Sequence, residues 1–260
     1  AGGVEIPKTW NDFIVAATKL TVKDADGNIK TAGAGLGTVN NVDYWSDLLG
    51  LMLLQEPGVD FRSPTSDPTA QVLSFYTGFV TDPTKKVWDV NLPQTTVFFE
   101  QGSLAFYFAP YSKVAEIKAA NPNLKFKIAP VPQLPGRQVA WASFWGETVS
   151  AKSAHQKEAW QLIKFLSSKE VAKSFAKPYA RMDLASSQLS DRELGAFVAQ
   201  GPYYKFWYLA TDGSDNGVND DMIKVWGVGL NAVLQGKTAA EALQNVSSGT
   251  KQILDKYKIK

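Results

Sequence analysis

Aromatic side chains stand next to amides and carboxylates at several points in the chain, and this pairing is the chemistry with which proteins bind sugars. A sugar offers flat apolar faces edged with hydroxyl groups, so a receptor needs aromatic platforms together with hydrogen-bond donors and acceptors. The chain has 8 Trp, 9 Tyr and 14 Phe residues, several of them beside Asn or Asp in segments that we place on loops. The candidate ligand contacts are Asn40, Asn41, Asp43, Tyr44, Tyr111, Trp141, Phe144, Trp145, Trp207, Tyr208, Asp212 and Asp215.

Tyr111 is the strongest candidate because of the segment that precedes it. Residues 103–108 form a short apolar run that fits a strand buried on both faces, and Gly102 suits the left-handed residue that closes a helix just before it. Pro110 ends the strand and leaves Tyr111 at its carboxyl end, the edge at which open α/β sheets present ligand-contacting groups. Residues 40–45 are placed at an earlier strand-to-helix junction of the same kind.

Other aromatic residues divide between a loop and helical faces. Residues 201–221 concentrate aromatic and aspartate side chains without a regular period, which favours a functional loop over a scaffold element. Trp10, Trp160 and Trp226 follow helical stripes and are predicted to fill the core. For Trp45 the stripe leaves core packing and ligand contact both open.

An enzymatic site is the weaker hypothesis. The chain has one histidine, His155, on the polar side of a predicted helix, and no cysteine, which excludes histidine triads, thiolate catalysis and sulfur-ligated metals. A glycoside hydrolase needs only two carboxylates across a sugar site, and Glu147 with Asp212 or Asp215 is the alternative that stays open. A calcium loop at residues 24–28 is disfavoured, since its glycine falls at the wrong position and the distal glutamate is missing. We expect no metal and no cofactor.

The composition fits a folded chain with a large buried core. Its 260 residues, 45% of them hydrophobic, suit one large domain or two smaller ones. The 27 basic and 25 acidic side chains leave a net charge of +2, which disfavours nucleic acid as a partner. No apolar run approaches the roughly 20 residues of a membrane-spanning helix, and the absence of cysteine leaves the redox compartment open. The chain begins with alanine, so we expect upstream sequence to have been removed or to be held elsewhere.

The first half of the chain alternates helices with short strands. Thr9 and Asp12 predict the start of a helix, and the turn at Asp26 and Gly27 predicts a hairpin that leads to a strand over residues 34–39. Further helices are expected from residues 45, 67 and 93.

The second half is predicted to cross between two units and then to become mostly helical. Residues 124–131 predict a second strand, and the prolines of residues 130–136 predict a stiff crossing. Four capping boxes predict helix starts, at Ser153 with Gln156, Ser167 with Glu170, Ser190 with Glu193 and Thr238 with Glu241. The first of these helices is predicted to bury Ala159, Leu162, Ile163 and Leu166.

Five segments carry a recognisable order of motifs. They are IPKTWNDFIVAATKL (6–20), DADGNIKTAGAGLG (24–37), the stretch 98–136, VSAKSAHQKEAWQLIKFLSSKEVAKSF (149–175) and GLNAVLQGKTAAEALQNVSSGTKQIL (229–254). Together they resemble the extracellular solute-binding proteins that supply ABC importers, a family that includes maltodextrin-binding proteins. Each motif alone is moderately specific, whereas their order and spacing together are strongly so.

The resemblance implies an α/β periplasmic-binding-protein fold with two lobes. Residues 1–140 would form the first segment of the C-terminal lobe, residues 141–190 the returning segment of the N-terminal lobe, and residues 191–260 a helical second segment of the C-terminal lobe. In this family a half-lobe precedes the first motif, and it is missing here. The helices of residues 153–175 would then expose Trp160 and Ile163 unless another polypeptide covers them.

The resemblance also implies a function without covalent chemistry. The protein would bind a solute, in the first place a mono- or oligosaccharide, in the periplasm or at the cell surface under a lipid anchor, and would deliver it to ABC permease subunits by lobe closure. Peptides, polyols and other polar ligands stay open. In the family pattern the 40–45 junction and Tyr111 supply ligand contacts, whereas Trp226 is displaced from the family's C-terminal aromatic position.

Overall fold

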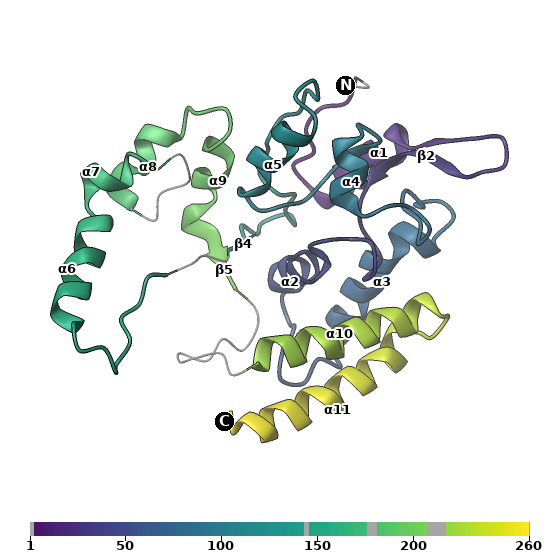
Figure 1. The fold of residues 1–260 in the computed structure, drawn as a ribbon. Coiled ribbons are helices and arrows are strands. Elements are labelled where there is room, and N and C mark those ends of the chain that lie inside the picture. The colour runs from purple at the N-terminus through teal and green to yellow at the C-terminus, as the bar shows by residue number, and fades with distance from the viewer. Residues whose placement is uncertain (1–2, 143–145, 176–180, 207–216, 260) are drawn as a thin grey trace.

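The computed structural model describes residues 3–142, 146–175, 181–206 and 217–259. They form a main body and a smaller helical unit that projects from it (Figure 1). The strands are β1 (Val22–Lys23), β2 (Ile29–Ala34), β3 (Leu104–Phe106), β4 (Ala140–Trp141) and β5 (Tyr204–Lys205). The helices are α1 (Trp10–Leu20), α2 (Trp45–Gln55), α3 (Asp67–Thr81), α4 (Thr95–Glu100), α5 (Lys113–Ala120), α6 (Gln156–Leu166), α7 (Lys169–Ala172), α8 (Met182–Gln188), α9 (Gly195–Ala199), the 3-10 helix η1 (Gly201–Tyr203), α10 (Val218–Leu234) and α11 (Ala239–Tyr257).

The main body is built on a three-stranded sheet with the order β1-β2-β3. β1 and β2 form the predicted hairpin, with Gly27 at φ +83° in its turn. β2 and β3 are parallel, and Ala32 lies opposite Leu104. The strand predicted over residues 34–39 is wrong in its bounds, because Gly37 at φ +103° already turns the chain toward α2.

α1 packs closely on β2. Gly33 makes this approach possible, since a Cβ at that position would stand 1.8 Å from the carbonyl oxygen of Ala17. The helix begins at the predicted capping box, in which the side chains of Thr9 and Asp12 each accept a backbone N–H. Trp10 is buried in the core, as predicted.

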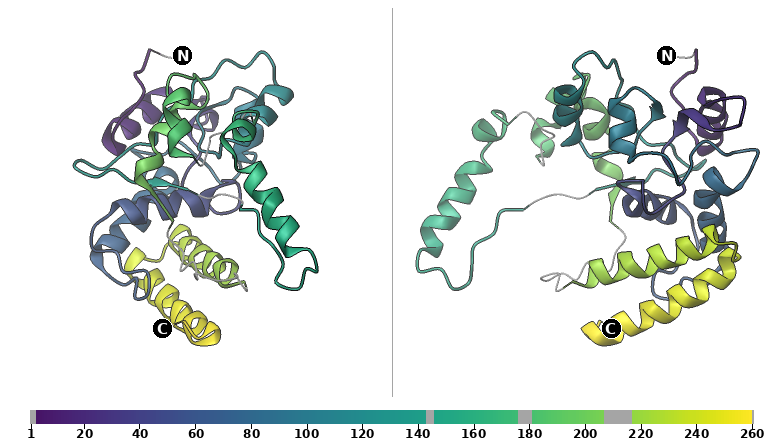
Figure 2. Two further views of the ribbon diagram at one scale, coloured as in Figure 1. Left: turned by 90° about the vertical axis from the view of Figure 1, so that its left-hand side faces the viewer. Right: turned by 45° about the vertical axis from the view of Figure 1, so that its right-hand side comes forward.

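The C-terminal helices α10 and α11 pack against each other and against α3, and they close one side of the main body (Figure 2). Trp226 of α10 and Val246 of α11 are buried in the same core as α1, which confirms the core prediction for Trp226. α11 starts at the predicted box of Thr238 and Glu241. In the described ranges, no helix combines the length and apolar character that a membrane span requires.

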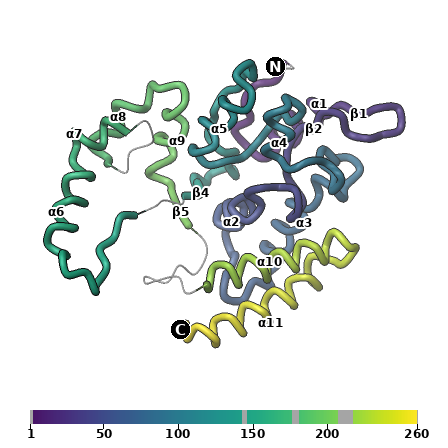
Figure 3. Tube along the Cα trace, viewed as in Figure 1, coloured from purple at the N-terminus to yellow at the C-terminus, as the bar shows by residue number. Residues whose placement is uncertain are grey.

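The chain leaves the main body after β4 and returns along β5, and these two strands pair in parallel (Figure 3). The crossing predicted at residues 130–136 is wrong, because the Gln133 backbone donates to the Lys8 carbonyl and bridges to Thr9, which holds that segment on the main body. The strand predicted at residues 124–131 is also wrong, since that segment runs into prolines, which cannot donate to a ladder, and pairs with no strand of the described chain.

The projecting unit contains α6, α7 and α8, and α6 buries none of its residues. Trp160 is 57% exposed and Phe165 is 62% exposed. The core prediction for Trp160 is therefore wrong, because no sheet of the described residues lies beneath this helix. The predicted burial of four further residues of this helix is wrong for the same reason. They are Ala159, Leu162, Ile163 and Leu166. Trp160 is thus exposed, as the family resemblance led us to expect, whereas Ile163 is half-buried.

The capping boxes predicted at Ser153, Ser167 and Ser190 are wrong by one to a few residues. α6 starts without a side-chain cap, and Ser168 caps α7 in place of Ser167. Asp191, in place of Ser190, accepts the backbone N–H groups of the turn before α9. In the last two cases a neighbouring side-chain oxygen competes for the same donors.

Candidate ligand-binding site

The carboxyl ends of β2 and β3 meet at one edge of the sheet, because the two strands are parallel neighbours. The chain that leaves β2 leads to Asp43 and Tyr44 before α2, and the chain that leaves β3 leads through Tyr107 to Tyr111 before α5. The fold therefore brings the two predicted junctions to the same edge.

Asp43 is held in place by the first turn of α4. Its Oδ2 accepts hydrogen bonds from Thr95 Oγ1 at 2.8 Å and from the N–H and hydroxyl of Thr96, both at 2.7 Å. Partial burial acts to raise the pKa of Asp43, but the hydrogen bonds from Thr96 and Thr95 outweigh it and lower that pKa. Asp43 is thus an ionised acceptor, and its Oδ1 makes no hydrogen bond to any residue that the structure describes.

Tyr107 joins this network and is absent from the predicted contacts. Its hydroxyl lies 2.6 Å from Thr96 Oγ1, and its ring packs on Phe99 with the centroids 5.2 Å apart. Burial raises the pKa of Tyr107, so its phenol stays protonated. The sequence did hold a signal, since Tyr107 is the one residue with a polar tip in the apolar run of residues 104–108.

Tyr44 occupies the N-cap position of α2 and is half-buried. Burial raises the pKa of Tyr44, while the positive charge of Lys113 in α5 acts in the opposite direction. The Lys113 ammonium also donates to both carboxylate oxygens of Glu116 at 2.7 Å, and its charge acts on Asp43 as well. Groups from both junctions therefore share one electrostatic neighbourhood.

Asp47 is a second carboxylate near Tyr44, and the sequence reasoning missed it. It lies in the first turn of α2, and burial raises its pKa to about 6. It forms no ion pair or hydrogen bond with the part of the chain that the structure describes. The sequence around Asp47 does not mark this burial.

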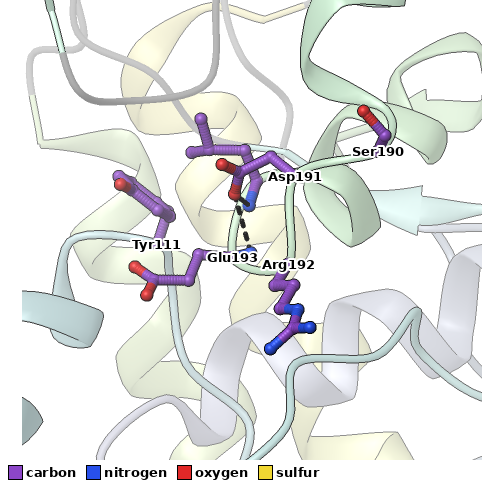
Figure 4. A pocket seen from close by; sticks show the side chains of 6 residues that line it. Tyr111, Ser190, Asp191, Arg192 and Glu193 are labelled. Carbon is purple, nitrogen blue, oxygen red and sulfur yellow. Dashed lines mark hydrogen bonds between the residues drawn. The ribbon is translucent and has the colours of Figure 1, made fainter.

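Tyr111 faces a different part of the molecule from α2. Its ring stands edge-on to Phe197 of α9, with the centroids 5.5 Å apart and the planes at 82°. Burial raises the pKa of Tyr111, and the negative charges of Glu193 and Asp191 act in the same direction. The ring lines a hollow of about 490 Å³ together with the turn of residues 190–194 (Figure 4). That volume falls in the range of small-molecule sites.

Asn41 has a structural role in place of the predicted ligand contact. Its buried amide donates to the carbonyls of Asp89 at 2.9 Å and Leu92 at 2.8 Å, and it accepts from Trp88 Nε1 at 3.1 Å and from the Thr38 hydroxyl. The donors and acceptors of the amide are all taken up inside the protein. The expectation that Asn41 contacts a ligand is corrected accordingly.

The remaining predicted contacts are only partly placed. Asn40 is exposed, and its carbonyl accepts from Gln94 Nε2 at 2.8 Å. Trp141 is half-buried in β4 against the core. Trp45 packs toward α10, where a Cβ added to Gly227 would stand 3.3 Å from Trp45 Cζ2, so the ring serves helix packing. Phe144, Trp145, Trp207, Tyr208, Asp212 and Asp215 lie outside the described residues.

The structure gives no distance between the two carboxylates of the hydrolase alternative. Glu147 is exposed, and both of its proposed partners lie outside the described residues. Within the ranges that the structure covers, no three His, Asp or Glu side chains gather closely enough to hold a metal ion.

A sequence profile of the family described as bacterial extracellular solute-binding protein matches residues 3–190, which is well over half of the chain. The chain belongs to this family. The resemblance seen in the motifs is thereby confirmed, and so is a location outside the cytoplasm. Members of the family bind solutes and are not enzymes, so the hydrolase alternative gains no support. A search of curated proteins finds no match to this solute-binding protein.

Solved structures share the fold of this solute-binding protein. The maltose/maltodextrin-binding domain MalE from Bdellovibrio bacteriovorus, bound to maltotriose, has a TM-score of 0.66 and 16% identity over 96% of this chain and 67% of that one. A solute-binding protein of an ABC transporter from Agrobacterium radiobacter K84, in complex with ribitol, has a TM-score of 0.62 and 22% identity over 96% of this chain and 66% of its own. UgpB from Mycobacterium tuberculosis, in complex with glycerophosphocholine, has a TM-score of 0.66 and 16% identity over 98% of this chain and 66% of its own. The chain thus spans about two-thirds of the length of these proteins, and the predicted two-lobe α/β fold class is confirmed.

Proposed function

We propose that this solute-binding protein captures a neutral hydroxylated ligand, in the first place a carbohydrate, and delivers it to the membrane subunits of an ABC importer. It would act in the periplasm or at the cell surface, free or held by a lipid anchor. Family membership supports solute capture, and the ligands named for the three similar structures all carry hydroxyl groups. The ionised Asp43, with its Oδ1 available, offers the acceptor that such groups need.

The observation that carries this proposal is the placement of Tyr111. Its ring comes from the junction after β3, and it lines the hollow with residues that follow the projecting unit (Figure 4). An aromatic face at the wall of a hollow edged by charged side chains is a platform for one face of a sugar ring. The ligand would therefore contact segments on both sides of the β4 and β5 crossings.

The paired crossings supply a hinge for lobe closure. Each of the two strands is two residues long, and they lie side by side in parallel, so the projecting unit can rotate about them as a body. On this proposal residues 141–190 belong to the N-terminal lobe, and residues 1–140 and 191–260 to the C-terminal lobe. The hollow then lies at the boundary of the lobes, with Ser190 on the N-terminal side and Tyr111 with residues 191–194 on the C-terminal side. A ligand that contacts both sides favours the closed arrangement through its differential affinity.

A further part of the N-terminal lobe, on the same polypeptide or on another, completes the proposed receptor. The chain spans about two-thirds of the length of the similar proteins. α6 also leaves Trp160 and Phe165 more than half exposed, although its pattern is that of a buried amphipathic helix.

Thermal unfolding in the presence of maltotriose, ribitol and glycerophosphocholine tests the proposed function. The unfolding temperature of a receptor rises with ligand concentration, since a ligand at 100 times its Kd adds about 2.7 kcal/mol to the free energy of unfolding. A glycoside hydrolase would release reducing ends from oligosaccharides, and a scaffold protein would show neither effect. Release of reducing ends, or no stabilisation by these ligands and a wider set of sugars and polyols, contradicts the proposal.

A further inference from the structure

A chain of hydrogen bonds through three elements ends on the carboxylate of Asp43. Tyr107 follows β3, Thr96 lies in the first turn of α4, and Asp43 precedes α2. The Tyr107 hydroxyl lies 2.6 Å from Thr96 Oγ1, and Thr96 Oγ1 lies 2.7 Å from Asp43 Oδ2. Thr96 is buried and Asp43 is exposed, so the chain leads from the inside of the protein to an acceptor at its surface.

Only one direction of proton donation satisfies this chain. The Thr96 hydroxyl has a single proton, and an ionised carboxylate can only accept, so Thr96 donates to Asp43 Oδ2. The Thr96 oxygen must then accept from Tyr107, whose phenol stays protonated because burial raises its pKa. Tyr107 therefore donates to Thr96, and Thr96 donates to Asp43.

Asp43 Oδ2 receives two further donors. Thr95 Oγ1 donates at 2.8 Å, and the Thr96 backbone N–H donates at 2.7 Å. The Thr95 oxygen in turn accepts the Asp43 backbone N–H at 3.1 Å, so the direction of the Thr95 hydroxyl is fixed as well. Three donors on Oδ2, and none from the described residues on Oδ1, hold the carboxylate in one orientation. Oδ1 is the oxygen that this arrangement leaves for a ligand.

Aromatic packing holds the start of the chain. The Tyr107 ring lies against Phe99, with the centroids 5.2 Å apart, and Phe99 stands edge-on to Phe126 at 5.8 Å. Among the described residues, Thr96 is the one hydrogen-bond partner of the Tyr107 hydroxyl. Packing thus fixes the ring, and the hydroxyl serves Thr96 alone.

We propose that Tyr107 and Thr96 are positioning residues for ligand binding at Asp43. Tyr107 fixes the Thr96 hydroxyl, Thr96 fixes Asp43 Oδ2, and Asp43 Oδ1 accepts a hydrogen bond from a ligand hydroxyl. An acceptor that is already oriented avoids the cost of ordering it when the ligand binds. This assignment rests on the proposed function, and it adds that the ligand must present a hydrogen-bond donor at this point.

Calorimetric titration with maltotriose and ribitol tests the positioning role in the variants Tyr107→Phe and Thr96→Val. Phenylalanine keeps the ring on Phe99 and loses only the hydroxyl, and valine keeps the backbone N–H donor and the branched shape. We expect Kd to rise about threefold in Tyr107→Phe and about tenfold in Thr96→Val, because Thr96 donates to Asp43 itself and Tyr107 acts one step away.

The matched control is Tyr76→Phe. The Tyr76 hydroxyl is also buried, and it donates to the Thr38 carbonyl at 2.9 Å, but it takes no part in the chain that ends on Asp43. This variant loses a buried tyrosine hydroxyl of the same kind, so Kd should stay at the wild-type value.

A second readout follows Asp43 without any ligand. The NMR resonance of its carboxyl carbon, assigned with Asp43→Asn, reports the pKa of Asp43. Hydrogen bonds from Thr96 lower that pKa, so it should rise in Thr96→Val and, by less, in Tyr107→Phe. The charge of Lys113, which is paired with Glu116, also acts on Asp43, and both residues remain in every variant. A purely structural role for Tyr107 would leave the pKa of Asp43 unchanged.

The outcomes separate the positioning role from the proposed function. A raised Asp43 pKa together with weaker binding supports the positioning role. If the wild type binds the probes but Tyr107→Phe and Thr96→Val bind like it, the positioning role is overturned and the proposed function stands. Weaker binding at an unchanged Asp43 pKa also overturns it, since the hydroxyls would then act through the fold. If the wild type binds neither probe, the proposed function fails and the positioning role with it.

Discussion

At the scale of single residues, the polar side chains at the strand ends divide into those that build the edge and those left for a ligand. Asn41 has all its donors and acceptors satisfied inside the protein, so a ligand could use it only by breaking the fold. Asp43 anchors α4 with one oxygen and keeps the other. Asp191 repeats that division in the turn beside Tyr111. A carboxylate fixed by one oxygen is a preorganised acceptor.

Asp47 is expected to make stability depend on pH. Burial raises its pKa from 3.8 to about 6, so its contribution to stability is full below pH 3.8 and is lost as the pH rises through 6. Asp47→Asn removes the ionisation, and at neutral pH it should raise the free energy of unfolding by about 1–2 kcal/mol. Urea unfolding at several pH values on both sides of this interval measures the effect.

The exposed Asp60→Asn variant is the control for this prediction, and it should follow the wild type throughout. The difference between wild type and Asp47→Asn should grow as the pH rises through the interval. A constant difference would show that the Asp47 carboxyl does not titrate where burial places it.

Some of the candidate ligand contacts could be predicted from the local sequence and others could not. Tyr111 follows from local sequence, because Pro110 ends a strand and fixes which residue stands at its carboxyl end. Tyr107 could also have been predicted, because it is the one residue with a polar tip in the apolar run of residues 104–108. The approach of the 190–194 turn to Tyr111 carried none, since it arises from a contact between segments that are distant in the sequence.

At the scale of elements, the crossing is anchored by Gln55 at the end of α2. This side chain is fully buried, and its Oε1 accepts from Trp10 Nε1 at 2.6 Å. Its Nε2 donates to the carbonyls of Pro132 at 3.0 Å and Val139 at 3.1 Å. One amide thus ties α1, α2 and the segment before β4 together, so the proposed hinge would begin after Val139.

Gln55→Leu should destabilise the protein by about 2–4 kcal/mol, because it leaves an indole N–H and two carbonyls buried without this partner. The matched control is Gln94→Leu, which removes a single hydrogen bond to the Asn40 carbonyl at an exposed position and should cost less than about 0.5 kcal/mol. Equilibrium denaturation compares the two. Similar losses in both variants would show that Gln55 is not the anchor.

Element boundaries were predictable where the signal is local. The capping boxes at Thr9 and Thr238 mark the starts of α1 and α11 correctly. The crossing was misplaced because Gln133 pairs with Lys8, a partner far along the chain. The pattern of α6 predicted a buried face, yet amphipathicity reveals only that a helix needs a partner and not whether that partner belongs to the same chain.

At the scale of the whole molecule, the apolar face of α6 is expected to drive association. We expect the chain alone to run above its monomer mass in size-exclusion chromatography with light scattering, because Trp160 and Phe165 are 57% and 62% exposed. Replacing both by glutamate should restore the monomer. Val15→Glu on α1, where the valine is 68% exposed, is the control and should leave association unchanged. A wild-type monomer with no companion fragment would contradict the proposed missing part of the lobe.

The central claim is that the Tyr111 ring receives a hydroxylated solute between the two lobes. The heat of binding of maltotriose or ribitol to the wild type, to Tyr111→Ala and to Tyr203→Ala tests it most directly, since Tyr203 is an exposed tyrosine outside the hollow. We predict that Tyr111→Ala weakens binding about tenfold or more, at least roughly 1.4 kcal/mol, and that Tyr203→Ala binds like the wild type. Equal affinities in all three proteins would contradict the account.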